Sequence, residues 1–326
     1  MVVYLFVVIQ IYNKFSGFLL FFTIIYNLSL EMSDEPKTNR IPDPGETVLG
    51  GTFMMNAGGK GANQAVAVAR IGGGVKFVAK IGDDMFGQRS LESYARDGID
   101  ISYIIKDGAA PSGMALITVD AAGENCIVVA PGANDRLTPA DIDAVADAIR
   151  RSEYLLMQLE IPMPAVEYAA AIAREAGTKV ILNPAPAAVL SDGLLSGLYM
   201  ITPNRSESQL LTGVVVDGWE GAERAADVLL ARGVRNVVVT LGSLGALVRS
   251  GEVSERIPAH RVDAVDTTAA GDVFNGALCV GLAEGRTLVE AVRFATRASA
   301  ISVTRMGAQS SIPTRAELDS LDCPEP

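Results

Sequence analysis

From Thr138 onward, segments with the apolar pattern of strands alternate with segments of helical periodicity. Helices are predicted over residues 140–150 and 164–175, and strands over 154–159, 179–182, 199–202 and 236–240. Because successive strands are joined by helical crossovers, this alternation predicts a mainly parallel, twisted sheet with helices on both faces. Ligands bind such sheets beyond the carboxyl ends of the strands. We therefore expect the functional residues at that edge.

The composition excludes several classes of function. The chain has 326 residues, of which 49% are hydrophobic, and a formal net charge of −11. This acidic balance argues against nucleic acid or an anionic membrane surface as a partner, because both carry negative charge themselves. Three scattered cysteines provide no disulfide framework, which favours a reducing, cytoplasmic location. His260 is the only histidine, which excludes multi-histidine zinc sites.

The first thirty residues differ from the remainder of the chain. They are strongly apolar, with Lys14 as the only charge and no alanine, and a helix of this length would span a bilayer core of about 30 Å. Three interpretations stay open: a mis-assigned or spliced-in start, a membrane anchor, and a secretory signal. We predict an apolar segment, 1–31, followed by one folded domain, 32–326, with a membrane as partner only if the segment is a genuine anchor.

A loop that turns into a helix carries the pattern with the clearest chemistry. Residues 266–275 read Asp-Thr-Thr-Ala-Ala-Gly-Asp-Val-Phe-Asn, and apolar periodicity predicts a helix from near Gly271 onward. The unpaired N–H groups at a helix start attract anions, and small residues let an anion approach the backbone. Asp272 would be ionised at neutral pH and able to accept a proton. The stretch suggests phosphoryl transfer to a hydroxyl; the alternative is an aspartate that only caps the helix.

Two motifs resemble the signatures of a known family. Residues 266–272, Asp-Thr-Thr-Ala-Ala-Gly-Asp, resemble the C-terminal signature of the ribokinase (PfkB) family of carbohydrate kinases. Residues 58–64, Gly-Gly-Lys-Gly-Ala-Asn-Gln, resemble its N-terminal signature in the ribokinase form. The similarity extends over roughly Ile41 to Leu318. It implies a three-layer, ribokinase-like α/β fold and transfer of a phosphoryl group from ATP to a sugar, with Asp272 as catalytic base.

The resemblance also implies a set of binding residues. The sugar would be held by Gly58, Gly59, Lys60, Asn63, Glu160 and Asp272. The transferring phosphoryl group would lie in an anion hole formed by Ala269, Ala270, Gly271 and Asp272. The nucleotide would lie against Asn204, Thr240, Gly242, Ser243, Gly245, Ala270 and Gly271, with Asn183 facing the phosphates. Taken alone, the glycines would also suit a tight turn, Glu160 a solvated strand end, and Asn204 a helix cap.

Two metal ions are implied in the same way. Mg²⁺ would be organised through water by Glu207. K⁺ would be enclosed by the side chains of Asp266 and Ser311 and by the backbone oxygens of Thr268, Ser302, Arg305 and Gly307. Mg²⁺ normally keeps most of its waters, so a single carboxylate that acts through water is a reasonable partner for it.

Residues 101–134 contain short strand patterns separated by Gly and Pro turns, with no helical pattern between them. This predicts a small antiparallel sheet. In the family, such a sheet forms a lid over the sugar together with strands at about 45–56, and it often provides a dimer surface. A lid excludes the water that would hydrolyse ATP. We expect a homodimer through it.

One family motif does not occur. Family members open with a strand that ends in Gly-Ser-x-Asn-x-Asp, whose Asn and Asp hold sugar hydroxyls about a dozen residues before a Pro-Gly-Glu. Here Pro-Gly-Glu is at 44–46, and Glu31 to Asp34 stand at that distance without the motif. We expect the first strand to be missing or replaced. The expected product is ribose 5-phosphate; the alternatives are a kinase for deoxyribose or a similar sugar, and a ligand-binding remnant with impaired catalysis.

Overall fold

The computed structural model describes residues 18–21, 25–31, 45–46, 52–119 and 125–320. Its helices are α1 (Lys60–Arg70), α2 (Met85–Arg96), α3 (Pro139–Asp143), α4 (Ala146–Arg150), α5 (Met163–Ala176), α6 (Asp192–Leu195), α7 (Arg205–Thr212), α8 (Trp219–Ala231), α9 (Ala270–Ala283), α10 (Leu288–Ser302) and α11 (Arg315–Ser320). Short 3-10 turns cover Gly132–Arg136, Gly242–Leu244 and Gln309–Ser311.

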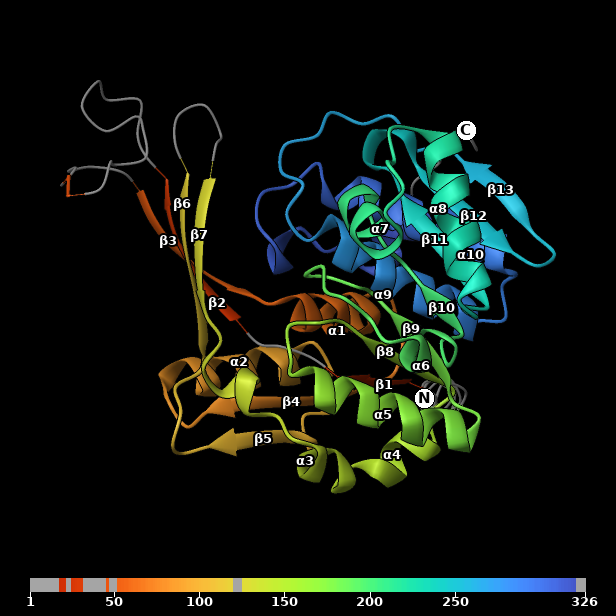
Figure 1. Ribbon diagram of the computed structural model, residues 1–326. Coiled ribbons are helices and arrows are strands. Elements are labelled where there is room, and N and C mark those ends of the chain that lie inside the picture. Colours follow the sequence, from red (N-terminus) through yellow and green to blue (C-terminus); the bar gives the residue numbers. More distant parts are fainter. Residues whose placement is uncertain (1–17, 22–24, 32–44, 47–51, 120–124, 321–326) are drawn as a thin grey trace, which may run out of the picture.

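The described residues form a large sheet and a small one (Figure 1). The large sheet consists of β1 (Phe18–Phe21), β4 (Val75–Gly82), β5 (Ile104–Asp107), β8 (Tyr154–Met157), β9 (Lys179–Leu182), β10 (Met200–Ile201), β11 (Asn236–Thr240), β12 (Ala246–Ser250) and β13 (Ser254–Ile257). Its order is β13-β12-β11-β10-β9-β8-β1-β4-β5, and only β12 and β13 run antiparallel to their neighbours. The predicted parallel α/β sheet is confirmed.

Alternate strand residues supply the two apolar layers between sheet and helices. In β11, Val238 packs with helices α1, α9 and α10, whereas Val237 and Val239 pack with helices α5 and α8 on the other face. Both faces are buried, so the strands read as continuous apolar runs rather than as alternating ones. The result is the predicted three-layer arrangement, and it directs the carboxyl ends of β8, β9 and β10 to one edge.

The small sheet forms the lid and extends away from the body of the molecule (Figure 1). Its order is β3-β2-β6-β7, with β2 (Ile25–Glu31), β3 (Thr52–Gly58), β6 (Gly113–Val119) and β7 (Asn125–Ala130). The sheet is mixed rather than antiparallel, because β2 runs parallel to β6. The strand pattern at 102–106, predicted as part of the lid, instead gives β5, which pairs with β4 at the edge of the large sheet. A four-residue apolar pattern suits either sheet, so only the pairing partner decides between them.

The centre of the large sheet is filled by the apolar N-terminal segment. Strand β1 pairs in parallel with β4 and β8, with Phe18 opposite Val75 and Tyr154. The first strand is therefore replaced rather than missing. Among the described residues, no helix is both long and apolar enough to cross a membrane. Residues 1–17 lie outside the described part, so the predicted boundary between 31 and 32 stays a prediction.

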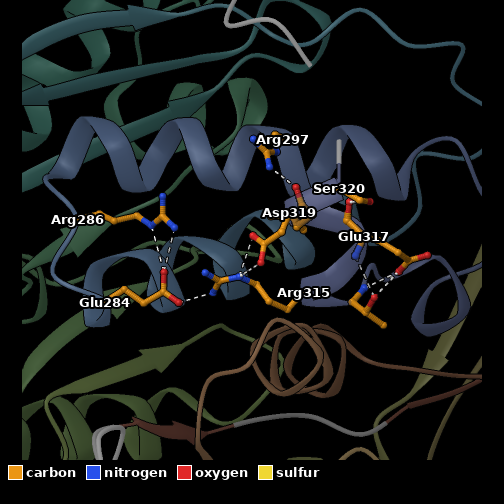
Figure 2. Close-up of polar contacts among 9 residues, drawn as sticks. Glu284, Arg286, Arg297, Arg315, Glu317, Asp319 and Ser320 are labelled. Carbon is orange, nitrogen blue, oxygen red and sulfur yellow. Dashed lines mark hydrogen bonds and ion pairs between the residues drawn. The ribbon is translucent and has the colours of Figure 1, made fainter. Parts of the chain in front are cut away.

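The C-terminal helix α11 is tied to the α9–α10 hairpin by a charged cluster (Figure 2). Glu284, immediately after α9, accepts hydrogen bonds from Arg286 and Arg315. The two guanidinium groups also lie over the Phe294 ring of α10, at 4.4 and 5.5 Å from its centroid. Cation–π contacts and a shared carboxylate act together here. This cluster fixes the far end of α9, the helix whose first turn carries Asp272.

Candidate active site

The first turn of α1 meets the carboxylate that follows β8. Strand β3 ends at Gly58, Gly59 adopts φ +92°, and α1 begins at Lys60. A positive φ of this size favours glycine, which explains the residue at the turn. The Lys60 N–H donates to Glu160 Oε2 at 2.8 Å. An acceptor at a helix N-terminus is favoured by the unpaired amides and the helix dipole, so Glu160 is more than a solvated strand end.

The first turn of α9 is set by an unusual residue. Ala269 adopts φ +60°, the only positive φ of a non-glycine residue in the described chain. The turn lets the Ala270 N–H donate to Thr267 O at 3.2 Å, so this amide of the predicted anion hole already has a partner. The amides of Gly271 and Asp272 lie in the first turn, where N–H groups have no acceptor within the helix. These two remain the best donors for an anion.

Close packing of α1 against α9 brings two amide side chains to Asp272. A Cβ at Gly276 would lie 2.6 Å from Ala67 Cβ, so only glycine allows this approach. Asn63 Nδ2 then donates to Asp272 Oδ2 at 2.9 Å, and Gln64 Nε2 donates to Asp272 Oδ1 at 3.0 Å. Asp272 is 6% exposed. Its carboxylate is therefore buried among polar donors rather than against the apolar core.

Three carboxyl groups of the site have raised pKa values, and burial is the main cause for each. Burial raises the pKa of Asp272, against the charge of Lys60 and the hydrogen bonds from Asn63 and Gln64. Burial likewise raises the pKa of Glu160 to about 7, again opposed by Lys60, and raises that of Glu207. Asp272 adds to the shift of both glutamates through its negative charge. Lys60 therefore acts as the shared counter-charge of the site.

The shift at Glu160 predicts a pH-dependent stability effect. The pKa of Glu160 is about 7 in the folded chain against an ordinary 4.5. The stability that this group contributes is thus fully present below pH 4.5 and is lost as the pH rises through 7. We expect Glu160→Gln to raise the unfolding free energy by about 1–3 kcal/mol at pH 8 and to leave it nearly unchanged at pH 4.5.

Urea denaturation of wild type and variant at the two pH values measures this difference. Glu175→Gln, an exposed glutamate on α5, is the matched control and should give no pH-dependent difference. A Glu160→Gln variant that is destabilised equally at both pH values would contradict the assignment of a buried, partly protonated carboxyl group.

The predicted nucleotide residues gather around α7 and β11. Asn204 forms an isolated bridge with Thr240. Its side chain accepts from the Glu207 N–H at 2.9 Å, and the Glu207 carboxylate accepts in return from the Asn204 N–H. Asn204 therefore caps helix α7, the alternative role given above, and it also lies beside the end of β11. Gly242 and Ser243 are exposed after β11, and Gly245 is close to Ile257–Ala259, where a Cβ would lie 2.0 Å from Ile257 O.

The residues predicted for the two cations have suitable chemistry. Both Glu207 oxygens accept from Asn204 at 2.8 and 2.9 Å and retain lone pairs for water bound to Mg²⁺. Asp266 accepts from Thr268 N and Gly307 N, each at 2.8 Å, which joins the two segments predicted to enclose K⁺. Ser302 and Ser311, which lie on either side of Gly307 in the sequence, are both buried. The atoms predicted to bind the two cations are oxygens, the ligands that hard cations prefer. Within the described residues, no cluster of three His, Cys, Asp or Glu side chains suits a metal ion.

Sequence reasoning missed several polar residues of this region. Gln64, Thr202 and Asn275 are buried and hydrogen-bonded around Asp272, and Asn183, which we placed facing the phosphates, joins them. A signal existed for two of them, since Gln64 and Asn275 are polar residues inside otherwise apolar helical stretches. Buried polar groups need partners, but the sequence does not show which partners they have.

Comparison with known proteins gives the site its context. The model of the pfkB family of carbohydrate kinases matches residues 30–315. The chain belongs to the PfkB family. It is 47% identical to a ribokinase of Haemophilus influenzae over 274 residues, which cover 84% of this chain and 90% of that protein. It is 37% identical to a deoxyribokinase of Salmonella typhimurium, over 85% of this chain and 91% of that one.

A solved structure of a PfkB relative agrees with the fold. The ribokinase of Arabidopsis thaliana, complexed with ribose and ATP, superimposes with a TM-score of 0.87 at 29% identity and covers 93% of this chain and 97% of that chain. Family membership makes this protein a sugar kinase, a phosphotransferase with an alcohol group as acceptor.

Proposed function

We propose that this PfkB kinase phosphorylates D-ribose at its 5-hydroxyl with ATP and releases ribose 5-phosphate and ADP. The observation that carries the proposal is the meeting of two helix N-termini at Asp272. Asn63, on the first turn of α1, donates to the carboxylate at 2.9 Å, while the Gly271 and Asp272 amides begin α9. The 47% identity to a ribokinase favours ribose over other sugars.

In the proposed reaction, Asp272 accepts the proton of the hydroxyl as its oxygen attacks the γ-phosphorus, and the bond from that phosphorus to the ADP oxygen breaks. The Gly271 and Asp272 amides donate to the transferring phosphoryl group. Lys60, Asn63 and Glu160 orient the sugar, which converts a bimolecular encounter into an oriented one. Glu207 would hold Mg²⁺ through water, which would neutralise charge on the phosphates, and Asp266 would help to hold K⁺ beside the loop.

A substrate panel tests this proposal directly. The purified chain is given ATP, Mg²⁺ and K⁺ with ribose, 2-deoxyribose or fructose, and ADP formation is followed while NMR locates the phosphate on the product. We expect the highest kcat/KM with ribose and phosphate on its 5-oxygen. A clear preference for 2-deoxyribose would move the assignment to the second candidate, which the 37% identity to a deoxyribokinase supports.

We also propose a cytoplasmic homodimer joined through the lid. The lid strands β6 and β7 expose Leu116, Ile127, Val128 and Val129, each more than half exposed. Leu116 lies opposite Val128 on one face of this projecting sheet, and exposed apolar neighbours of this kind are typical of an interaction surface. Light scattering of the purified chain should give the mass of a dimer, and Val128→Lys should shift it toward the mass of a monomer.

A further inference from the structure

A closed ring of buried hydrogen bonds connects Asp272 to the first turn of its own helix. From the carboxylate, the ring passes to Gln64 Nε2 at 3.0 Å, which also donates to Asn183 Oδ1 at 3.1 Å. Asn183 Nδ2 donates to Thr202 O at 3.4 Å, and Thr202 Oγ1 donates to Asn275 Oδ1 at 2.7 Å. Asn275 Nδ2 then donates to Gly271 O at 2.8 Å. Gly271 precedes Asp272, so the ring closes.

The ring joins four separate parts of the fold. Gln64 comes from α1, Asn275 from α9, and Asn183 and Thr202 directly follow β9 and β10. Strand pairing fixes the last two, because Asn183 N donates to Met157 O and Thr202 N donates to Leu182 O. The ring therefore connects the first turn of α9 by hydrogen bonds to the rigid edge of the sheet.

The side chains of the ring are buried, whereas Gly271, where the ring closes, is exposed. Gln64 is 0%, Asn275 1%, Thr202 2% and Asn183 7% exposed. A buried polar group that loses its partner costs about 1–3 kcal/mol. The Thr202 hydroxyl also lies 3.5 Å from Leu182 O, but Asn275 Oδ1 at 2.7 Å is its nearer acceptor. The two protons of the Gln64 amide serve Asp272 and Asn183, and this leaves the amide one orientation. The ring fixes orientation more strictly than apolar packing would.

We propose that Gln64, Thr202 and Asn275 are positioning residues that hold the Asp272 carboxylate and the adjacent Gly271 and Asp272 amides in one fixed geometry. This rests on the proposed function, since it assumes that Asp272 is the base and that the amides receive the phosphoryl group. The ring couples the base to the turn that carries the backbone donors, and the hydrogen bonds of these three residues are made to protein groups.

The charged groups that face Asp272 define the expected pH effect. They are Lys60 from α1, Glu160 after β8 and Glu207 on α7. The Gln64 donor lowers the pKa of Asp272 while burial raises it. Removing that donor with Gln64→Met leaves a near-isosteric side chain and the same three charges. The acidic limb of the kcat/KM profile should therefore move to higher pH.

The link through Thr202 is tested with a matched set of variants. Thr202→Val removes the hydroxyl at nearly constant volume, and Thr202→Ser keeps it. Thr296→Val removes the hydroxyl of another buried threonine, which donates to Val292 O inside α10. We expect Thr202→Val to lower kcat about 10- to 100-fold with little change in the KM for ATP. Thr202→Ser and Thr296→Val should stay within about threefold of wild type.

Amide hydrogen exchange provides a readout that does not depend on activity. The peptide that spans residues 266–275 should exchange faster in Thr202→Val than in wild type, Thr202→Ser or Thr296→Val. Unchanged exchange of this peptide in Thr202→Val would overturn the inference. If Asp272→Asn abolishes activity, an unchanged kcat in Thr202→Val together with an unchanged pH profile in Gln64→Met would also overturn the inference. If Asp272→Asn itself remains active, the proposed base is wrong, and the exchange data still decide whether the ring holds the turn.

Discussion

Replacing Asp272 with Asn is expected to lower kcat by about 10²–10⁴-fold, the usual contribution of a positioned general base. The amide has nearly the same shape but cannot accept the hydroxyl proton. It also presents an N–H group where Asn63 and Gln64 now donate to both carboxylate oxygens. Nucleotide affinity should persist, because the Gly271 and Asp272 backbone amides are unchanged. Steady-state kinetics with ribose and fluorescence titration with an ATP analogue measure the two effects.

The control for this variant is Asp263→Asn, an exposed aspartate in the loop that leads to the signature. It should retain wild-type turnover. Turnover of Asp272→Asn within about tenfold of wild type would place the base elsewhere. Glu160 would then be the next candidate, because its pKa of about 7 suits proton transfer near neutral pH. The double variant with Glu160→Gln would identify it by losing the residual activity.

The sequence predicted those parts of the fold in which local pattern and tertiary context agree. Strands 179–182 and 236–240 have the predicted bounds, and α9 begins one residue before Gly271. These segments are buried on both faces or begin at small residues, so their pattern is unambiguous. The strand predicted over 102–106 was placed in the wrong sheet, because the choice depends on β4, a segment about twenty residues away in sequence.

The site was predictable to the extent that its residues fall in contiguous motifs. Lys60, Asn63, Glu160 and Asp272 were placed in one site, and the structure brings them together. The orientation of Asp272 could not be predicted, since Gln64, which donates to it directly, lies 208 residues away in sequence. Asn275 accepts from Thr202, which lies 73 residues away. Nor does the pattern show that Thr267 O already binds the Ala270 amide, because that depends on the left-handed conformation of Ala269.

The N-terminal strand β1 completes the large sheet but lacks the polar residues expected to bind the sugar. Strand β1 pairs with β4 and β8, and such backbone pairing accepts almost any apolar sequence. The polar residues that PfkB relatives are expected to place after this strand have no counterpart here, because Gly17 is the only glycine before Gly45 and is followed by Phe18 rather than by serine. We therefore expect the chain to bind ATP normally and its sugar weakly.

Restoring the motif should correct this defect. The variant Leu20→Gly, Phe21→Ser, Thr23→Asn and Ile25→Asp gives the order Gly-Ser-x-Asn-x-Asp, which begins in the last two residues of β1. One neutral and one charged hydrogen-bonding group contribute about 0.5–1.5 and 1.5–3 kcal/mol. We therefore expect kcat/KM for ribose to rise by about 10²-fold or more, mainly through a lower KM, with the KM for ATP unchanged.

The control carries only Leu20→Gly and Phe21→Ser, which alter the strand without adding the sugar ligands. It should not improve on the starting chain, and weaker strand packing should lower its melting temperature. An equal gain in the control would mean that the backbone turn, not the Asn and Asp side chains, limits sugar binding. If the unaltered chain already binds ribose tightly and the four substitutions change nothing, Lys60, Asn63 and Glu160 hold the sugar without help from this strand, and the N-terminal segment serves only to complete the sheet.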